Sequence, residues 1–115
     1  MWKELPLDQA PDTLGARTLS TWGFFHQNAC VAQVGFMYPN YMSCPAIWLV
    51  LATRQPYGRF HMGTHLDHLQ WLVGEPLVYA ETQNEPATRV ALLAGFTEVQ
   101  KHGRITLLKR VAKWH

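Results

Sequence analysis

The sequence predicts an α/β (α+β) fold, in which a mixed sheet is assembled in the order β-β-β-α-β-α-β-β. Residues 46–52 form a nearly continuous apolar run, as expected of a strand that is buried on both faces. Two segments with helical spacing of apolar residues, 60–73 and 86–94, each lie between strand-like segments. This strand–helix–strand alternation predicts a parallel crossover in the middle of the chain, with antiparallel hairpins on either side of it.

The length and composition of the chain predict one globular domain. The 115 residues suffice for one hydrophobic core, and a content of 48% hydrophobic and 16% charged residues excludes a disordered chain. Residues 1–16 contain Pro6, Pro11 and Gly15 and are predicted to be an irregular lead-in with a short helical turn. The domain itself is then expected to span residues 17–115.

Three strands are predicted in the first half of the domain. Residues 18–26 are rich in β-branched and aromatic side chains, which favour strands. Gln27 and Asn28 form a turn signal, so residues 30–38 should return as the second strand of a hairpin. The buried run over 46–52 is the third strand.

The second half is predicted to contain two helices and three strands. These elements are a helix over 60–73, a strand over 77–81, a helix over 86–94, and strands over 97–102 and 104–112 that meet at Gly103. The inner side of the first helix should hold Met62, Leu66, Leu69, Leu72 and Val73. Gly74 and Pro76 end that helix.

The second helix carries clear signals at both ends. Asn84 can cap its N-terminus by accepting a backbone N–H, and Pro86 suits the first turn, where no N–H is needed. Gly95 suits the left-handed residue that follows a helix. The apolar face of this helix is predicted to hold Ala87, Val90, Leu93 and Ala94.

This segment resembles the C-terminal half of the GNAT-type N-acetyltransferases. Their signature there is an Asn, an Ala three residues later, an apolar helix face, and a Gly-Phe pair eleven and twelve residues after the Asn. Asn84, Ala87, Gly95 and Phe96 match that spacing without a gap. The resemblance covers residues 18–110, and it implies that the chain lacks the usual first strand of the family and the two helices that follow it.

The resemblance implies acetyl-CoA as the acyl donor and an amine as the acceptor. In the family, backbone N–H groups of a loop and the helix after it hold the pyrophosphate. The corresponding segment here, residues 54–64, admits two alignments. One places Gln55 and Gly58 in the family pattern but puts Phe60 where Gly or Ala belongs, whereas the other makes Gly63 the last glycine and misplaces Gly58.

Arg54 and Arg59 lie in the same segment, and their positive charges can attract phosphate. The cofactor-binding residues that the resemblance implies are Arg54, Gln55, Gly58, Arg59, Gly63 and Asn84.

The catalytic groups are less complete than the cofactor pattern. Many family members carry a Tyr seven residues after the Asn, as the acid for the departing thiolate, but this position is Ala91, which donates no proton. Glu81 is the candidate general base, because it lies at the carboxyl end of a predicted strand, where such sheets bind ligands. A solvated strand end is the alternative for Glu81. The sequence therefore leaves two functions open: N-acyl transfer, or a non-catalytic binding or structural protein.

A histidine cluster offers a second kind of site. His61, His65 and His68 share one helical face with Asp67 beside them, and two His at this spacing can bind zinc. The pattern lacks the Glu of a His-Glu-x-x-His motif, which favours a solvated face. No metal is expected.

The last fifteen residues of the chain are basic, which bears on what the protein could bind. After Gln100 there is no acidic residue, and the cations there are Lys101, Arg104, Lys109, Arg110 and Lys113. Such an edge can meet nucleic acid or an acidic partner, but the sequence favours a solvated strand edge. The missing N-terminal elements suggest that a protein partner or a second copy covers an exposed sheet edge.

The sequence predicts a cytoplasmic protein. No apolar run is long enough to span a membrane, and the first residues lack the apolar core of a signal peptide. Cys30 and Cys44 do not form a Cys-x-x-Cys pair, which favours free thiols. Residues 18–24 also resemble the opening of small, divergent GNAT-like proteins of short-tailed bacteriophages, some of which are internal virion proteins. That resemblance implies the host cytoplasm or the virion as the location.

Overall fold

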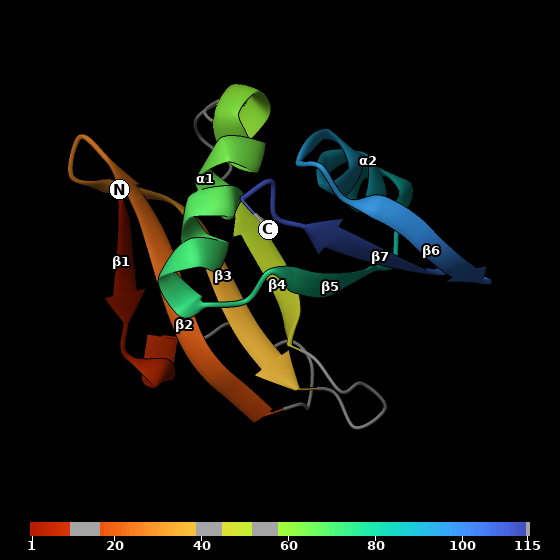
Figure 1. The fold of residues 1–115 in the computed structure, drawn as a ribbon, viewed down its shortest axis with the longest axis horizontal. Helices are drawn as coiled ribbons and strands as arrows, with labels where there is room; N and C mark the ends of the chain where they lie inside the picture. Colours follow the sequence, from red (N-terminus) through yellow and green to blue (C-terminus); the bar gives the residue numbers. More distant parts are fainter. Residues whose placement is uncertain (10–16, 39–44, 52–57, 115) are drawn as a thin grey trace. The chain divides into compact units, whose positions relative to one another are not determined.

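The computed structural model describes residues 1–9, 17–38, 45–51 and 58–114, and Figure 1 shows its ribbon. The chain divides into two compact units, Met1–Gly58 and Arg59–His115. The elements of the first are β1 (Trp2–Leu5), the short 3-10 helix η1 (Leu7–Gln9), β2 (Arg17–His26), β3 (Ala29–Tyr38) and β4 (Ala46–Leu51). From the unit boundary onward the elements are α1 (Gly58–Val73), β5 (Leu77–Thr82), α2 (Glu85–Leu93), β6 (Thr97–His102) and β7 (Ile105–Val111).

The first unit is an antiparallel sheet with the strand order β1-β2-β3-β4. The predicted turn between β2 and β3 is confirmed. Gln27 and Asn28 have φ angles of 51° and 65°, and a two-residue hairpin turn of type I′ requires a positive φ at both of its central residues. The buried side chains of this sheet include Val34, Phe36 and Ile47.

The lead-in predicted over residues 1–16 is wrong at its start. Trp2–Leu5 form β1, which pairs antiparallel with β2 and places Trp2 opposite Phe24. The two rings meet edge to face with their centroids 5.1 Å apart, and both side chains are buried. This cross-strand aromatic contact stabilises a strand that local propensity alone did not indicate. The expected short helical turn is present as η1, and the expectation that a first strand is missing is incorrect.

The second unit is built on an antiparallel sheet with the order β5-β7-β6. Register places Val78 opposite Arg110, and Ala80 opposite Leu108, and these four side chains are all buried. Their neighbours along the strands, such as Glu81, face the other way and are more exposed. The sheet therefore has one buried face, and this face carries the polar residue Arg110 among its apolar ones.

The helices present narrower apolar faces than the sequence predicted. Met62, Leu66 and Leu69 of α1 are buried as expected, but Leu72 is 40% exposed. In α2, Leu93 is 72% exposed, so its predicted inward position is wrong.

The buried residue of α2 is Ala91, one helical turn beyond the half-buried Ala87, and the C-cap residue Ala94 is buried one turn further on. Small side chains at this spacing allow a helix to lie close to its sheet, which leaves the larger leucines on the outside.

From residue 17 onward the order of elements is β-β-β-α-β-α-β-β, so the predicted fold class is confirmed. Neither described helix combines the length and the apolar character that crossing a membrane requires.

Candidate functional site

The turn between β5 and α2 is held by the side chain of Asn84. Its Oδ1 accepts a hydrogen bond from the Ala87 backbone N–H at 2.8 Å, and its backbone is extended, with φ −151° and ψ 160°. Pro86 occupies the first turn of α2, where it removes no hydrogen bond. The predicted cap is confirmed, and no side chain or carbonyl of the described residues accepts a hydrogen bond from the Asn84 amide N–H groups.

Two threonine hydroxyls strengthen this turn. Thr88 Oγ1 donates to the Asn84 carbonyl at 3.0 Å, so the 2.6 Å hydrogen bond between Thr82 and Thr88 is donated by Thr82. The end of β5 is thereby joined by hydrogen bonds to the first turn of α2, within the segment that carries the family resemblance.

The end of α2 is fixed just as firmly. Gly95 has φ +95°, its N–H donates to the Leu92 carbonyl at 3.1 Å, and the Phe96 N–H donates to the Ala91 carbonyl at 3.0 Å. These are the paired hydrogen bonds of a Schellman motif, and Phe96 is buried behind them. Ala91 is 8% exposed and has no side-chain proton donor.

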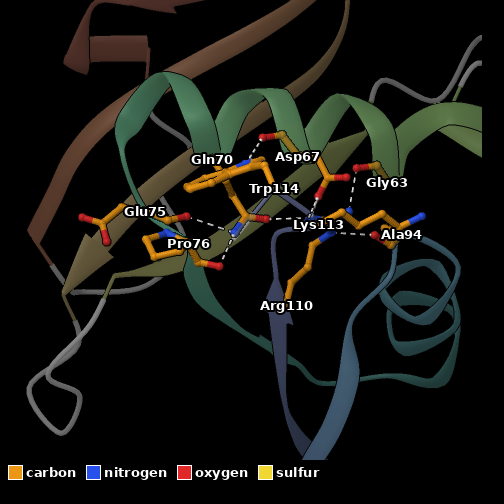
Figure 2. Close-up of polar contacts among 9 residues, drawn as sticks. All are labelled: Gly63, Asp67, Gln70, Glu75, Pro76, Ala94, Arg110, Lys113 and Trp114. Atoms are coloured by element: carbon orange, nitrogen blue, oxygen red, sulfur yellow. Dashed lines mark hydrogen bonds and ion pairs between the residues drawn. The ribbon is translucent and has the colours of Figure 1, made fainter.

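The most densely bonded polar group in the second unit is the buried guanidinium of Arg110, shown in Figure 2. Its Nε donates to the Ala94 carbonyl at 2.8 Å, and its Nη2 donates to the Gly63 carbonyl at 2.6 Å. Its Nη1 donates to Asp67 Oδ1 at 2.6 Å and to Gln70 Oε1 at 2.8 Å. Arg110 therefore joins β7 to α1 and to the C-terminal end of α2.

The partners of Arg110 are themselves bonded. Gln70 is fully buried, and its Nε2 donates to the carbonyls of Glu75 and Pro76 at 3.0 and 3.2 Å. Asp67 accepts the Lys113 backbone N–H at Oδ1, and the Asp67 carbonyl accepts the Trp114 indole N–H at 2.8 Å. The network thus extends to the α1–β5 turn and to the last residues of the chain.

Two opposing effects act on the pKa of Asp67. Burial raises it, but the hydrogen bonds from Arg110 and from the Lys113 N–H, together with the positive charge of Arg110, outweigh burial and hold the pKa below its ordinary value of 3.8. The ionised form of Asp67 is therefore favoured by folding.

We expect the stabilising effect of the Asp67 charge to disappear in acid. Because the pKa of Asp67 is lower in the folded state, the stability contributed by its charge is fully present above pH 3.8. It is lost as the pH falls through the folded-state pKa. The difference in unfolding free energy between the wild type and Asp67→Asn should therefore be widest near about pH 7 and should narrow below about pH 4. Urea unfolding of both proteins across this range measures it. A difference that stays constant down to about pH 2 would show that Asp67 acts through geometry and not through charge.

The position of Arg110 corrects the picture of a uniformly solvated basic edge. Lys101, Arg104, Lys109 and Lys113 are exposed as predicted, whereas Arg110 is 2% exposed. The sequence did carry a signal for this. Thr106, Leu108, Arg110 and Ala112 alternate with exposed residues, and a period of two places all four on one face.

Glu81 lies on the face of β5 opposite to Arg110. It is the penultimate residue of β5, it is exposed, and its cross-strand neighbour is Leu107. The structure therefore keeps Glu81 near the carboxyl end of its strand, as predicted, and open to solvent.

Apart from Asn84 at the β5–α2 turn, the predicted cofactor residues fall into three places. Arg54 and Gln55 lie outside the described residues. Gly58 and Arg59 are the first two residues of α1, which begins two residues before the predicted start at residue 60. Gly63 lies inside α1, where its carbonyl accepts Arg110, and a Cβ built on Gly63 would come within 3.3 Å of the Ala94 carbonyl oxygen.

The histidine face of α1 has acquired other contacts. Asp67 forms an ion pair with Arg110, and the His68 ring lies 6.2 Å from the ring of Trp71. Within the described parts of the chain, no three His, Cys, Asp or Glu side chains come together as a metal site.

The chain is similar to known proteins in its structure but not detectably in its sequence. Scans against protein-family models and against curated proteins both find no match. Among solved structures, the chain is similar to a chimeric spermidine N-acetyltransferase built from SpeG of Vibrio cholerae and hSSAT. The TM-score is 0.61, the identity is 14%, and the match covers 83% of this chain and 68% of the other.

A second similar structure is an acetyltransferase from Agrobacterium tumefaciens. Here the TM-score is 0.53, the identity is 13%, and the match covers 78% of this chain and 58% of the other. Both similar structures are acetyltransferases of the GNAT type. The fold of this chain is therefore that of the GNAT acetyltransferases.

Proposed function

We propose that this protein is an N-acyltransferase that uses acetyl-CoA and transfers its acyl group to an amine. The observation that carries the proposal is the similarity of fold to a spermidine N-acetyltransferase over 83% of the chain. The capped turn at Asn84 and the Gly95-Phe96 stop support it, because they reproduce the spacing through which the sequence resembles that family.

The start of α1 fits the phosphates of the cofactor. The helix is 16 residues long and begins with Gly58 and Arg59. A glycine allows phosphate to approach the backbone N–H groups at a helix N-terminus, and an arginine adds charge-assisted hydrogen bonds. We assign Gly58, Arg59, Arg54 and Gln55 to phosphate binding, and we assign the free amide N–H groups of Asn84 to the remainder of the cofactor.

Acetyl-CoA, when bound, supplies an acyl group that is activated as a thioester. The acceptor amine must lose a proton to attack it, and Glu81 is the carboxylate that we assign as the base. Ala91 cannot return a proton to the leaving sulfur, so water must do so. We therefore expect a slow enzyme in which binding and orientation contribute most of the rate.

The first test is calorimetric titration with acetyl-CoA and with CoA, followed by an assay of thiol release with spermidine as the acceptor. Micromolar binding with turnover supports the proposal. Glu81→Gln should then lower the rate by about a hundredfold with unchanged acetyl-CoA affinity, as expected for loss of a general base. The matched control is Glu98→Gln, another exposed carboxylate in the same unit.

Ala91 favours a second function, in which the fold is kept for binding without catalysis. Its side chain is buried and aliphatic at the position where the family places its acid. Binding of acetyl-CoA without turnover of any amine, or no binding up to millimolar ligand, would favour this alternative. The predicted phage origin, a place inside a virion, self-association, nucleic-acid binding and a cytoplasmic location belong to either function and stay predictions.

A further inference from the structure

A groove of about 490 Å³ opens between α2 and the β6–β7 hairpin. Figure 1 shows these elements side by side in the second unit. Its lining comes from the β5–α2 turn, from α2 and from the hairpin: Gln83, Asn84, Glu85, Thr88, Arg89, Leu92, Glu98, Lys101, Gly103, Arg104 and Thr106. A volume of this size lies within the range of small-molecule sites, roughly 300–1,000 Å³.

The charges of the groove favour an anion. Its three cations are Arg89, Lys101 and Arg104, against the carboxylates of Glu85 and Glu98. Arg89 and Glu85 form an ion pair at 3.6 Å, and both side chains are largely exposed, so this pair holds each of them only weakly.

Two cations of the groove remain available to a ligand. Within the part of the chain that the structure describes, Lys101 and Arg104 form no ion pair, and both are exposed on the hairpin. They therefore outnumber the single remaining carboxylate, Glu98.

The other groups of the groove favour an organic phosphate over a simple anion. A phosphate monoester carries a charge of about −1.5 to −2 and three acceptor oxygens, so it can engage Lys101 and Arg104 together. Leu92 is 48% exposed on the α2 wall and offers an apolar surface for the organic part of such a ligand.

The floor of the groove is rigid enough to hold such a ligand. Thr88 is fixed by its bonds to Thr82 and to the Asn84 carbonyl, and Thr106 is 4% exposed on β7, directly opposite Thr82. A preformed floor lowers the entropy that binding must overcome.

We propose that this groove binds a small phosphate monoester, with its phosphate on Lys101 and Arg104 and its organic part against Leu92. The site is distinct from the cofactor residues at the start of α1. It does not depend on acyl transfer, because the groove is formed whether or not the chain is catalytic.

The test uses adenosine monophosphate as the probe, with adenosine and inorganic phosphate as the separate halves of the ligand. We expect calorimetry to show adenosine monophosphate binding at least about tenfold more tightly than either half, since the charged and apolar contacts are both needed. Amide NMR shifts should change at residues 101–106 and at Thr88 and Arg89. Equal affinity for adenosine, or for inorganic phosphate alone, would overturn the assignment.

Variants on the hairpin provide matched controls. Lys101→Glu with Arg104→Glu should weaken binding of the probe by at least about tenfold, because two charge-assisted contacts are lost. Lys109→Glu makes one such charge reversal on the exposed face of β7, outside the groove, and should leave the affinity unchanged; it is compared with each single variant, Lys101→Glu and Arg104→Glu. An equal loss in Lys109→Glu would show unspecific attraction, and displacement of the probe by acetyl-CoA would show that the groove is part of the cofactor site. Either result overturns the proposal of a separate site.

Discussion

Replacing Arg110 by methionine should lower the free energy of unfolding by about 3–5 kcal/mol, as expected when one partner of a buried ion pair is removed. Arg110 is 2% exposed, and its guanidinium satisfies two side chains and two carbonyls at once. Methionine fills much of the volume but donates no hydrogen bond, so the partly buried charge of Asp67 is left without its cation. Urea unfolding monitored by tryptophan fluorescence measures the loss.

Two further variants separate charge from geometry at Arg110. Arg110→Lys keeps the charge but cannot reproduce the planar fork, and should recover only part of the loss. Lys109→Met changes the neighbouring exposed residue of the same strand, and should stay within about 0.5 kcal/mol of the wild type. A loss below about 1 kcal/mol in Arg110→Met would contradict the assigned role of the network.

Coupling between the two charged partners is measurable in a double-mutant cycle. Once Arg110 is gone, the ionised Asp67 has no cation to repay its burial, so adding Asp67→Asn should restore part of the stability lost in Arg110→Met. Simple additivity of the two changes would mean that the pair contributes no interaction energy.

The sequence predicted the elements well because their boundaries rest on local chemistry. Asn84 before a helix, Gly95 after it, and the Gln27-Asn28 turn all act within a few residues, and the structure places each as expected. The strand β1 was missed because its main evidence is a partner 22 positions away, Phe24 opposite Trp2. The secondary-structure propensities of residues 1–16 depend on local sequence and cannot reveal a contact with Phe24.

The candidate sites were harder to predict because they depend on tertiary contacts. Arg110 has partners 40 to 47 residues earlier in the chain, Gly63, Asp67 and Gln70, and no local pattern links them. Gly63 was assigned to a phosphate loop by one of two alignments to the family pattern, whereas the structure places it in α1 against Ala94 and Arg110. Lys101 and Arg104 of the groove become neighbours of α2 only when the β6–β7 hairpin folds back onto it.

Replacing Gly95 by alanine should cost roughly 1–3 kcal/mol, because two penalties act at one position. Gly95 has φ +95°, which residues with a side chain rarely adopt. A Cβ there would also lie 3.3 Å from Arg110 Nε, the atom that donates to the Ala94 carbonyl. The substitution therefore strains the end of α2 and presses on the buried guanidinium at the same time.

Gly103→Ala is the matched control for Gly95→Ala. Gly103 also has a positive φ, 59°, but nothing lies within 4 Å of the position of its Cβ. Its cost should be that of the backbone alone, about 1 kcal/mol. The excess loss in Gly95→Ala over Gly103→Ala, measured by urea unfolding, contains the contact with Arg110 and any additional backbone strain at the larger φ of Gly95. If this excess persists when both glycine variants are made in an Arg110→Met background, the strain comes from the backbone of α2. If it disappears, the guanidinium is its cause, and the stop of α2 and the buried network form one structural unit.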